Sequence, residues 1–251
     1  MKRISGNSLQ RPVILAIDVE HRASTIGEHQ MMAKDDIPRR IYRYMPVHRL
    51  WQVLATKRLY FMRNSKWDDP FEGFLVKQYC TINNKDYGHL NANKFFLCCC
   101  RIEERDHLWQ NYTPNKDGVL VKLNTKGLLA LESSIQYHPI KYPKRDEIKE
   151  LLDQINKKQF QRDHILSLFF IKRFAFEPEK EIRFLLEDST VKDDTVGVEI
   201  EPKRIIMNVL FDPRMDHDTY EYHREFIQDR FGISNISHSS LYDPERCFQP
   251  D

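Results

Sequence analysis

The chain has 251 residues, of which 41% are hydrophobic, 12% aromatic and 30% charged. This composition is typical of a folded globular protein with a well-solvated surface and argues against extensive disorder. The 39 basic and 37 acidic residues leave a net charge of +2, so no overall field draws the chain to nucleic acid or to a membrane. No apolar run approaches the roughly 20 residues that span a bilayer, and no signal-peptide pattern is present. We therefore expect a cytoplasmic protein.

Residues 1–38 are predicted to be a partly ordered N-terminal extension with one strand-like run at 13–19. A single domain is expected over 39–237, followed by a polar tail over 238–251. Apolar runs and alternation predict strands at 41–44, 59–62, 95–100, 119–123, 181–187, 196–200 and 205–211. Helical spacing predicts helices near 50–54, 74–79, 107–112, 143–155 and 219–230, and helical periodicity resumes over 165–172.

Residues 83–93 are interpreted as a polar connection, and Gly232 is placed to cap the last helix. The helices and strands are interspersed without a regular alternation of strand, helix and strand. The sequence therefore predicts an α+β fold, with a mixed, mostly antiparallel sheet core and flanking helices.

The five cysteines include three in a row, Cys98, Cys99 and Cys100. Adjacent cysteines rarely pair with each other without strain, which fits a reducing compartment. In a strand, Cys98 and Cys100 face one side and Cys99 the other. Buried thiols are favoured over a zinc site because no CxxC pair or suitably spaced histidine accompanies them.

Several common motifs are absent from the sequence. It contains no GxxxxGK[ST], no GxGxxG after a strand, no HExxH, no GxSxG and no EF-hand pattern. With only 8 glycines, a backbone-lined pyrophosphate loop is also disfavoured. His107, His138, His217 and His223 share no metal spacing. The basic residues Lys172, Arg173, Lys203 and Arg204 lie among acids and give only a weak nucleic-acid signal.

Arg43 lies between Tyr42 and Tyr44 at the start of the main domain. An arginine stays charged and could hold a phosphate or a carboxylate there. An edge strand with a surface arginine stacked on a tyrosine explains the same pattern equally well.

The segment EPEKEIR at 177–183 is the best candidate for catalysis. If strand geometry extends back through it, Glu179, Glu181 and Arg183 point to one face. Two carboxylates on one face repel, which would raise at least one pKa, while the arginine partly compensates. Such a pair suits acid–base work or the stabilisation of a cationic transition state. A ladder of ion pairs on a solvated sheet is the structural alternative.

The segment WDDPFEG at 67–73 follows a predicted strand. Asp68, Asp69 and Glu72 are candidate ligands for a hard cation, but too few for a complete site. We favour a structural role, in which an aspartate caps the turn at Pro70 while Trp67 and Phe71 anchor the loop. The sequence thus predicts a rigid wall formed by five residues and no metal. The wall residues are Trp67, Asp68, Asp69, Phe71 and Glu72.

An ordered series of segments connects these features. It comprises IYRYM at 41–45, LYF at 59–61, WDDPFEG, HLWQNY at 107–112, VLVKLN after Gly118 and EKEIRFLL at 179–186. The series resembles a large, mostly bacterial family of uncharacterised domains with KYR, NDPFE, MWxHY and YExEWR motifs. It is similar to AbiGi-type abortive-infection proteins, which implies a setting of phage defence or toxin–antitoxin systems. Here Asp68, Asn111 and Ile182 replace the Asn, His and Trp that this family usually has.

The order of Arg43, Tyr60 and the pair Glu179 and Glu181 is also similar to that of ADP-ribosyltransferases. That resemblance implies a defence or toxin-type effector that acts on NAD or another nucleotide-linked substrate, with NAD as substrate rather than as a fixed cofactor. Glu181 and Glu179 are then the expected catalytic residues. The expected substrate-binding residues are Arg43, Tyr44, Tyr60, Arg183, Trp109 and Tyr112.

Two alternatives stay open. The first is a non-enzymatic sensing or antitoxin-like module that binds a protein of a defence system, in which case Arg43 and Glu181 should face away from any shared cleft. The second and less favoured one is a metal-dependent nuclease built on Asp68, Asp69 and Glu72. A small nucleotide or a protein is the expected partner, nucleic acid is less favoured, and no membrane is expected.

Overall fold

The computed structural model describes residues 37–67 and 69–245. The strand-like run at 13–19, the rest of residues 1–36 and Asp68 lie outside the described part. The described residues form one mixed sheet. Its strands are β1 (Arg40–Pro46), β2 (Arg58–Met62), β3 (Lys94–Cys100), β4 (Gly118–Asn124), β5 (Gln136–Pro139), β6 (Glu181–Glu187), β7 (Thr195–Glu199), β8 (Ile206–Phe211) and β9 (Ile236–His238).

The strand order is β5-β6-β3-β1-β4-β8-β9, with β2 joined to β3 and β7 joined to β2. Every pair of these strands is antiparallel except β8 and β9. The predicted α+β class with a mostly antiparallel sheet is therefore confirmed. All seven predicted strands are present.

Helices flank the sheet. The α-helices are α1 (Val47–Thr56), α2 (Phe74–Ile82), α3 (Tyr87–Asn91), α4 (Asp106–Tyr112), α5 (Thr125–Leu129), α6 (Arg145–Asn156), α7 (Pro202–Ile205) and α8 (His217–Phe231). The 3-10 helices are η2 (Asn64–Lys66), η3 (Pro70–Gly73), η4 (Arg162–Phe170) and η5 (Phe174–Glu179). As predicted, Gly232 ends α8 with a left-handed φ of 64°.

Two sequence predictions are wrong in detail, and some short elements were not predicted. The polar connection at 83–93 contains α3, because the side chain of Asp86 caps a helix by accepting from the Gly88 amide at 2.8 Å. The periodic stretch after residue 165 is the 3-10 helix η4 rather than an α-helix. The short elements α5, β5 and β9 were not predicted, and β9 occupies the boundary where a polar tail was expected to begin.

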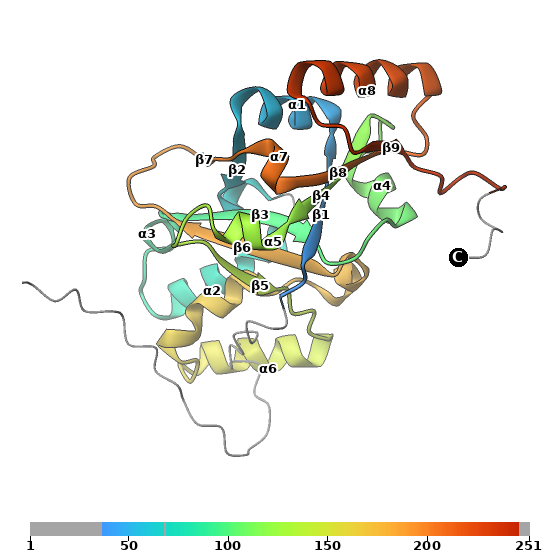
Figure 1. The fold of residues 1–251 in the computed structure, drawn as a ribbon. Coiled ribbons are helices and arrows are strands. Elements are labelled where there is room, and N and C mark those ends of the chain that lie inside the picture. Colours follow the sequence, from blue (N-terminus) through green and yellow to red (C-terminus); the bar gives the residue numbers. More distant parts are fainter. Residues whose placement is uncertain (1–36, 68, 246–251) are drawn as a thin grey trace, which may run out of the picture.

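The two faces of the sheet are covered differently (Figure 1). Helices α1 and α8 lie on one side in that view, and α2 and α6 on the other. On the α1 side, Ile41, Leu50 and Ile227 belong to one continuous core. The opposite face has two separate cores, one under α2, α6 and η4 and one under α4. The sheet is thus left partly open between them.

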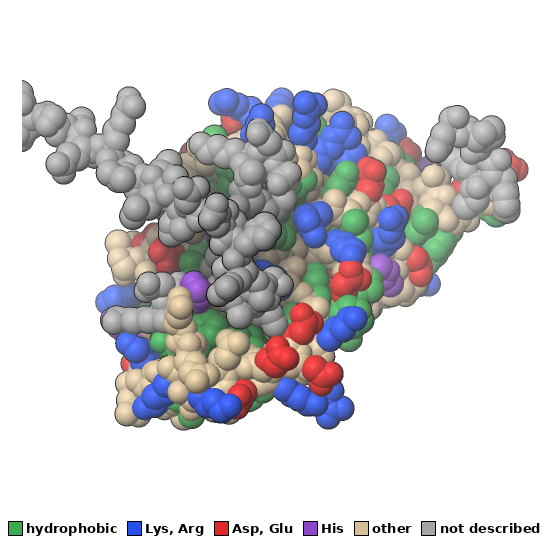
Figure 2. All heavy atoms as spheres, turned by 90° about the horizontal axis from the view of Figure 1, so that it is seen from below, with side chains coloured by type: hydrophobic (Ala, Val, Ile, Leu, Met, Phe, Trp, Pro, Cys, Tyr) green, Lys and Arg blue, Asp and Glu red, His purple; other side chains and the backbone are tan. Residues whose placement is uncertain are grey.

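The outer surface carries both signs of charge. Acidic and basic side chains are mixed on the face that Figure 2 shows, as the near-neutral composition predicts. None of the helices in the described part of the chain has the length and apolar character required to cross a bilayer.

Candidate functional site

A pocket of about 780 Å³ lies on the divided face of the sheet. Its wall includes Phe96 from the core under α2 and Tyr44 and Cys100 from the core under α4. Strands β6, β3 and β1 form its base, since Glu181 lies opposite Cys100 and Cys100 opposite Tyr42. A buried charged cluster lies at this base. It consists of Glu72, Lys172, Glu179, Glu181 and Arg183, all of which line the pocket.

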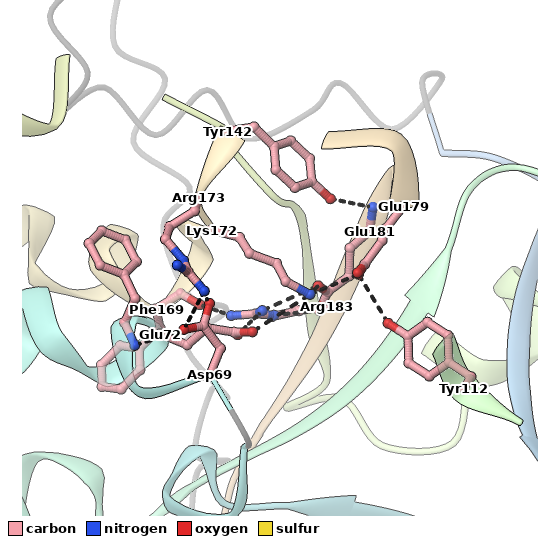
Figure 3. Close-up of polar contacts among 11 residues, drawn as sticks. Asp69, Glu72, Tyr112, Tyr142, Phe169, Lys172, Arg173, Glu179, Glu181 and Arg183 are labelled. Carbon is pink, nitrogen blue, oxygen red and sulfur yellow. Dashed lines mark hydrogen bonds and ion pairs between the residues drawn. The ribbon is translucent and has the colours of Figure 1, made fainter. Parts of the chain in front are cut away.

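Arg183 is the most enclosed member of the charged cluster, with 1% of its surface exposed. Its Nε donates to Glu181 Oε1 at 2.6 Å, and its Nη1 donates to the Phe169 carbonyl at 2.7 Å. Nη2 pairs with Glu72. The guanidinium also lies 4.1 Å from the centre of the Trp67 ring. Arg183 is therefore held in one orientation by contacts from several elements (Figure 3).

Lys172 joins the three carboxylates of the charged cluster. Its ammonium lies 2.7 Å from Glu179 Oε2, 3.2 Å from Glu181 Oε2 and 3.6 Å from Glu72 Oε1. It also lies 4.7 Å from the centre of the Phe176 ring. Removing both cations would leave three buried carboxylates facing one another, so Lys172 and Arg183 are what make the arrangement possible.

The cations decide the charge of Glu181. Burial by itself would raise the pKa of this carboxyl, but Arg183, through its charge and its hydrogen bonds, and Lys172 lower it to about 2. The opposite holds for Glu72, where burial raises the pKa despite the opposing charge of Arg183. The sequence predicted that repulsion between Glu179 and Glu181 raises the pKa of at least one of them. For Glu181 the pKa is lowered instead, so this carboxylate stays ionised.

Glu179 reaches the charged cluster by a different route from the one predicted. Strand β6 begins at Glu181, and Glu179 ends η5 instead of continuing the strand. Lys180 between them has a left-handed φ of 47°. The turn brings Glu179 to Lys172, where the hydroxyl of Tyr112 also donates to Glu179 Oε2 at 3.0 Å. Burial and the nearby carboxylates raise the pKa of Tyr112, so its hydroxyl stays protonated and acts as a donor.

Arg43 lines the same pocket at a break in the sheet. Strands β1 and β3 pair only at Tyr42 and Cys100. Beyond that pair, Nη1 of Arg43 donates to the carbonyl of Cys98 at 2.6 Å. No carboxylate in the described part of the chain forms an ion pair with Arg43. Its charge therefore remains available to an anionic group in the pocket.

The loop at 67–73 does more than form a wall. Trp67 contacts Phe96 at a ring-centre distance of 5.1 Å and lies against Arg183. Asp69 caps the turn by accepting from the Phe71 amide at 3.0 Å. Glu72, 7% exposed, belongs to the charged cluster. The predicted cap is confirmed, and the loop also supplies one carboxylate of the site.

Two bonds link Asp69 to Arg173 beside the pocket. Arg173 Nε lies 3.2 Å from Asp69 Oδ2, and Nη2 lies 3.1 Å from Oδ1. Phe71 instead stacks on Phe74 at a ring-centre distance of 6.0 Å and is not part of the lining. Within the described residues, no three His, Cys, Asp or Glu side chains are arranged to hold a metal ion.

Tyr60 and Trp109 do not line the pocket. Tyr60 lies opposite Gly197 in the pairing of β2 with β7, and a Cβ built on Gly197 would meet its ring at 3.2 Å. The ring therefore covers a strand glycine. Trp109 is completely buried and meets Tyr44 edge-to-face at 4.8 Å. The sequence predicted that both residues bind the substrate, but neither lines the pocket. Trp109 instead packs against Tyr44, which does line it.

The three consecutive cysteines alternate across β3 as predicted. Cys99 faces the core under α1, and Cys100 faces the core under α4. Cys98 lines the pocket beside Glu181, where burial and that carboxylate raise the pKa of its thiol. These three cysteines and Cys80 are free. A raised pKa keeps Cys98 in the thiol form at neutral pH.

Lys172 is the residue that sequence reasoning missed, since it was considered only as part of a weak basic patch. The signal that could have found it is its place directly after the apolar run 165–171. A lysine that ends a buried run needs a buried acid as its partner. Glu72 was assigned to the site only as part of the loop wall, because its partners lie about 100 residues further along the chain.

Comparisons with known proteins give limited matches. Residues 108–184 match the model of a family described as "Protein of unknown function (DUF2971)". This segment contains all but the first two residues of α4 and four of the five residues of the charged cluster, but covers less than a third of the chain. None of the curated proteins searched matches the sequence.

Two solved structures are similar over most of the chain. Both are DarT from Thermus sp. 2.9. The complex with NAD+ has 10% identity and a TM-score of 0.39, and covers 80% of this chain and 96% of DarT. The complex with ADP-ribosylated ssDNA has 11% identity and a TM-score of 0.41, with coverages of 80% and 94%. At these values neither structure bears on the chemistry of this chain. The chain is thus similar in part to a family of unknown function.

Proposed function

We propose that the pocket binds NAD or a related nucleotide-linked substrate and that the protein is an ADP-ribosyltransferase-like effector. The observation that carries this proposal is an ionised carboxylate, Glu181, at the base of a pocket that also contains Arg43. The pKa of Glu181 is lowered to about 2. Such a carboxylate can stabilise a cation that forms during a reaction at neutral pH.

The other walls of the pocket suit a dinucleotide. Its volume of about 780 Å³ lies within the usual range for small-ligand sites, roughly 300–1,000 Å³. Tyr44, Trp67 and Tyr112 offer aromatic rings to planar groups. Arg43 carries a charge that no described carboxylate neutralises, as a diphosphate-binding residue requires.

In the proposed reaction, the bond between C1′ of the ribose and the nicotinamide nitrogen breaks, and its electron pair leaves with nicotinamide. Glu181 stabilises the oxocarbenium-like cation that develops on the ribose. An oxygen or nitrogen of the acceptor then bonds to C1′ and gives its proton to Glu179 in this proposal. Lys172 and Tyr112 hold Glu179 Oε2 and thereby orient the carboxylate.

The competing functions are less well supported. A non-enzymatic module was expected to have Arg43 and Glu181 facing away from a shared cleft, whereas both line one pocket. A metal-dependent nuclease would need Asp69 and Glu72 as ligands, but both are already engaged by cationic side chains. A role in phage defence accompanies the proposal only through the sequence resemblance. A cytoplasmic location accompanies it only as the expectation drawn from the cysteines and from the lack of a signal-peptide pattern.

The test is the release of nicotinamide from NAD by the purified protein, measured by chromatography with and without candidate acceptors. Glu181→Gln should lower the rate at least 100-fold, about 2.7 kcal/mol of transition-state stabilisation. Glu150→Gln, on the exposed surface of α6, is the matched control and should leave the rate unchanged. Absence of nicotinamide release by the wild type, or equal release by Glu181→Gln, would refute the proposal.

A further inference from the structure

The charges in the pocket are unevenly distributed. At its base, the carboxylates Glu72, Glu179 and Glu181 outnumber the cations Lys172 and Arg183 by one. All five are buried, with no more than 8% of any side chain exposed. Water therefore screens this excess weakly. Burial raises the pKa of Glu72. At a pH above that raised pKa all three carboxylates are ionised, and the base of the pocket then has an uncompensated negative charge.

Arg43 contributes a positive charge to the pocket, in contrast to the excess negative charge at the base. It lines the same pocket and has no ion-pair partner among the described carboxylates. Its Nη1 is bound to a main-chain carbonyl, which leaves the guanidinium charge unneutralised. A ligand that complements both features has an anionic group for Arg43 and a cationic group for the charged cluster.

Aromatic side chains lie around this acidic base. Tyr112 donates to Glu179, and Phe176 lies against the Lys172 ammonium, so both rings border the charged cluster. The faces of aromatic rings attract cations as well as planar groups. A flat, positively charged heterocycle would gain from both the rings and the carboxylates.

We infer that the charged cluster selects the pyridinium charge of its ligand, so that the pocket takes the oxidised, cationic form of a nicotinamide dinucleotide and discriminates against neutral-ring forms. This inference rests on the proposed function and names the ligand feature that its site recognises. The shape of the ring contributes less than its charge, because the excess carboxylate acts through the field at the base of the pocket.

The test uses two dinucleotides that the enzyme cannot cleave. The carbocyclic analogue of NAD+ has the pyridinium charge, whereas benzamide adenine dinucleotide has a neutral ring of the same shape. Isothermal titration of the full chain should show that the charged analogue binds at least tenfold more tightly, a difference of about 1.4 kcal/mol. Equal affinities for the two compounds would overturn the inference.

Two variants test which residues cause the preference for the charged dinucleotide. Glu72→Gln removes the excess charge but keeps the shape of the side chain, and it should reduce the preference to threefold or less. Arg43→Gln should weaken both dinucleotides and ADP-ribose to the same extent and leave the preference unchanged. A preference that survives in a folded Glu72→Gln protein, with its thermal unfolding checked, would refute the assignment to the charged cluster.

The outcome separates this inference from the proposed function. Turnover of NAD together with equal affinity for the charged and neutral dinucleotides would refute only the charge selection. If the wild-type protein binds neither dinucleotide nor ADP-ribose, both the proposed function and the inference fail. Because the wild-type comparison needs no substitution, misfolded variants do not affect it.

Discussion

Arg183 and Glu181 lie two residues apart on β6 and form a buried ion pair, in which Arg183 Nε donates to Glu181 Oε1 at 2.6 Å. Side chains at this spacing share a face of the sheet. The acid that the proposed reaction needs and the cation that keeps it ionised therefore come from one strand. Because both residues are on β6, a rigid-body shift of this strand would not change the distance between Glu181 and Arg183.

The first prediction concerns the loss of the Arg183 guanidinium. Arg183→Met should reduce the free energy of unfolding by about 3–5 kcal/mol, because it leaves the buried Glu181 and Glu72 with Lys172 as their remaining cation, which they share with Glu179. Arg183→Lys should recover only part of this loss, since an ammonium cannot reproduce the planar fork. Urea denaturation measures the effect, with the exposed Arg145→Met on α6 as control. A loss below 1 kcal/mol for Arg183→Met would contradict the prediction.

The second prediction concerns acid stability. The pKa of Glu181 is about 2 in the folded protein, against an ordinary value of 4.5. A lowered pKa gives stability that is present above pH 4.5 and lost as the pH falls toward 2. Between pH 6 and pH 3, the wild type should lose about 2 kcal/mol more unfolding free energy than Glu181→Gln. Glu72, whose pKa is raised, acts in the opposite direction in both proteins.

Urea denaturation at fixed pH values compares the two proteins. Parallel losses of stability in the wild type and in Glu181→Gln would mean that Glu181 has no lowered pKa in the folded state.

The third prediction concerns a second buried ion pair, away from the pocket. Asp212 is completely buried, receives the Thr113 hydroxyl at 3.0 Å and pairs with Arg214 at 2.6 Å. Asp212→Asn should cost about 3 kcal/mol of unfolding free energy, because it leaves the arginine without its charge partner. The affinity for ADP-ribose, measured by titration at a temperature where the variant is folded, should stay within twofold. A larger change would connect this ion pair to the pocket.

The fourth prediction concerns Tyr60. Because its ring covers Gly197 rather than lining the pocket, Tyr60→Ala should cost about 1 kcal/mol of stability. Tyr60→Phe retains the ring and should have almost no effect. Nicotinamide release should be unchanged in both variants. A selective loss of turnover in Tyr60→Ala would restore the sequence-based interpretation of this tyrosine as a substrate-binding residue.

The sequence was informative where periodicity decides the outcome. Alternation on β6 placed Glu181 and Arg183 on one face, and the apolar run at 95–100 gave β3 with Cys98 and Cys100 on the same side. The sheet could be predicted because most of its strands have patterns that only a buried strand satisfies. Short elements such as α3 and β9 were not predicted. The Asp86 cap defines α3 and pairing with β8 defines β9, and neither element has a periodic pattern of its own.

The site was predictable only in part, because some of its contacts join segments that are far apart in the sequence. Arg43, Glu179 and Glu181 were identified from chemistry and order, and they do line one pocket. Lys172 and Glu72 were not placed in the charged cluster because their contact joins segments about 100 residues apart. The periodic spacing of residues within a helix or a strand cannot predict a contact between such distant segments. The clue was indirect, since Lys172 directly follows an apolar run and Glu72 lies shortly before the apolar start of α2.

The left-handed turn at Lys180 has a mechanical consequence. It separates η5, which ends at Glu179, from β6, which begins at Glu181. The two acids belong to different rigid pieces that meet through the ammonium of Lys172. A substitution that changes the turn at Lys180 would therefore displace Glu179 relative to Glu181. The pivot itself accepts glycine or asparagine far more readily than valine or isoleucine, because a branched Cβ opposes a positive φ.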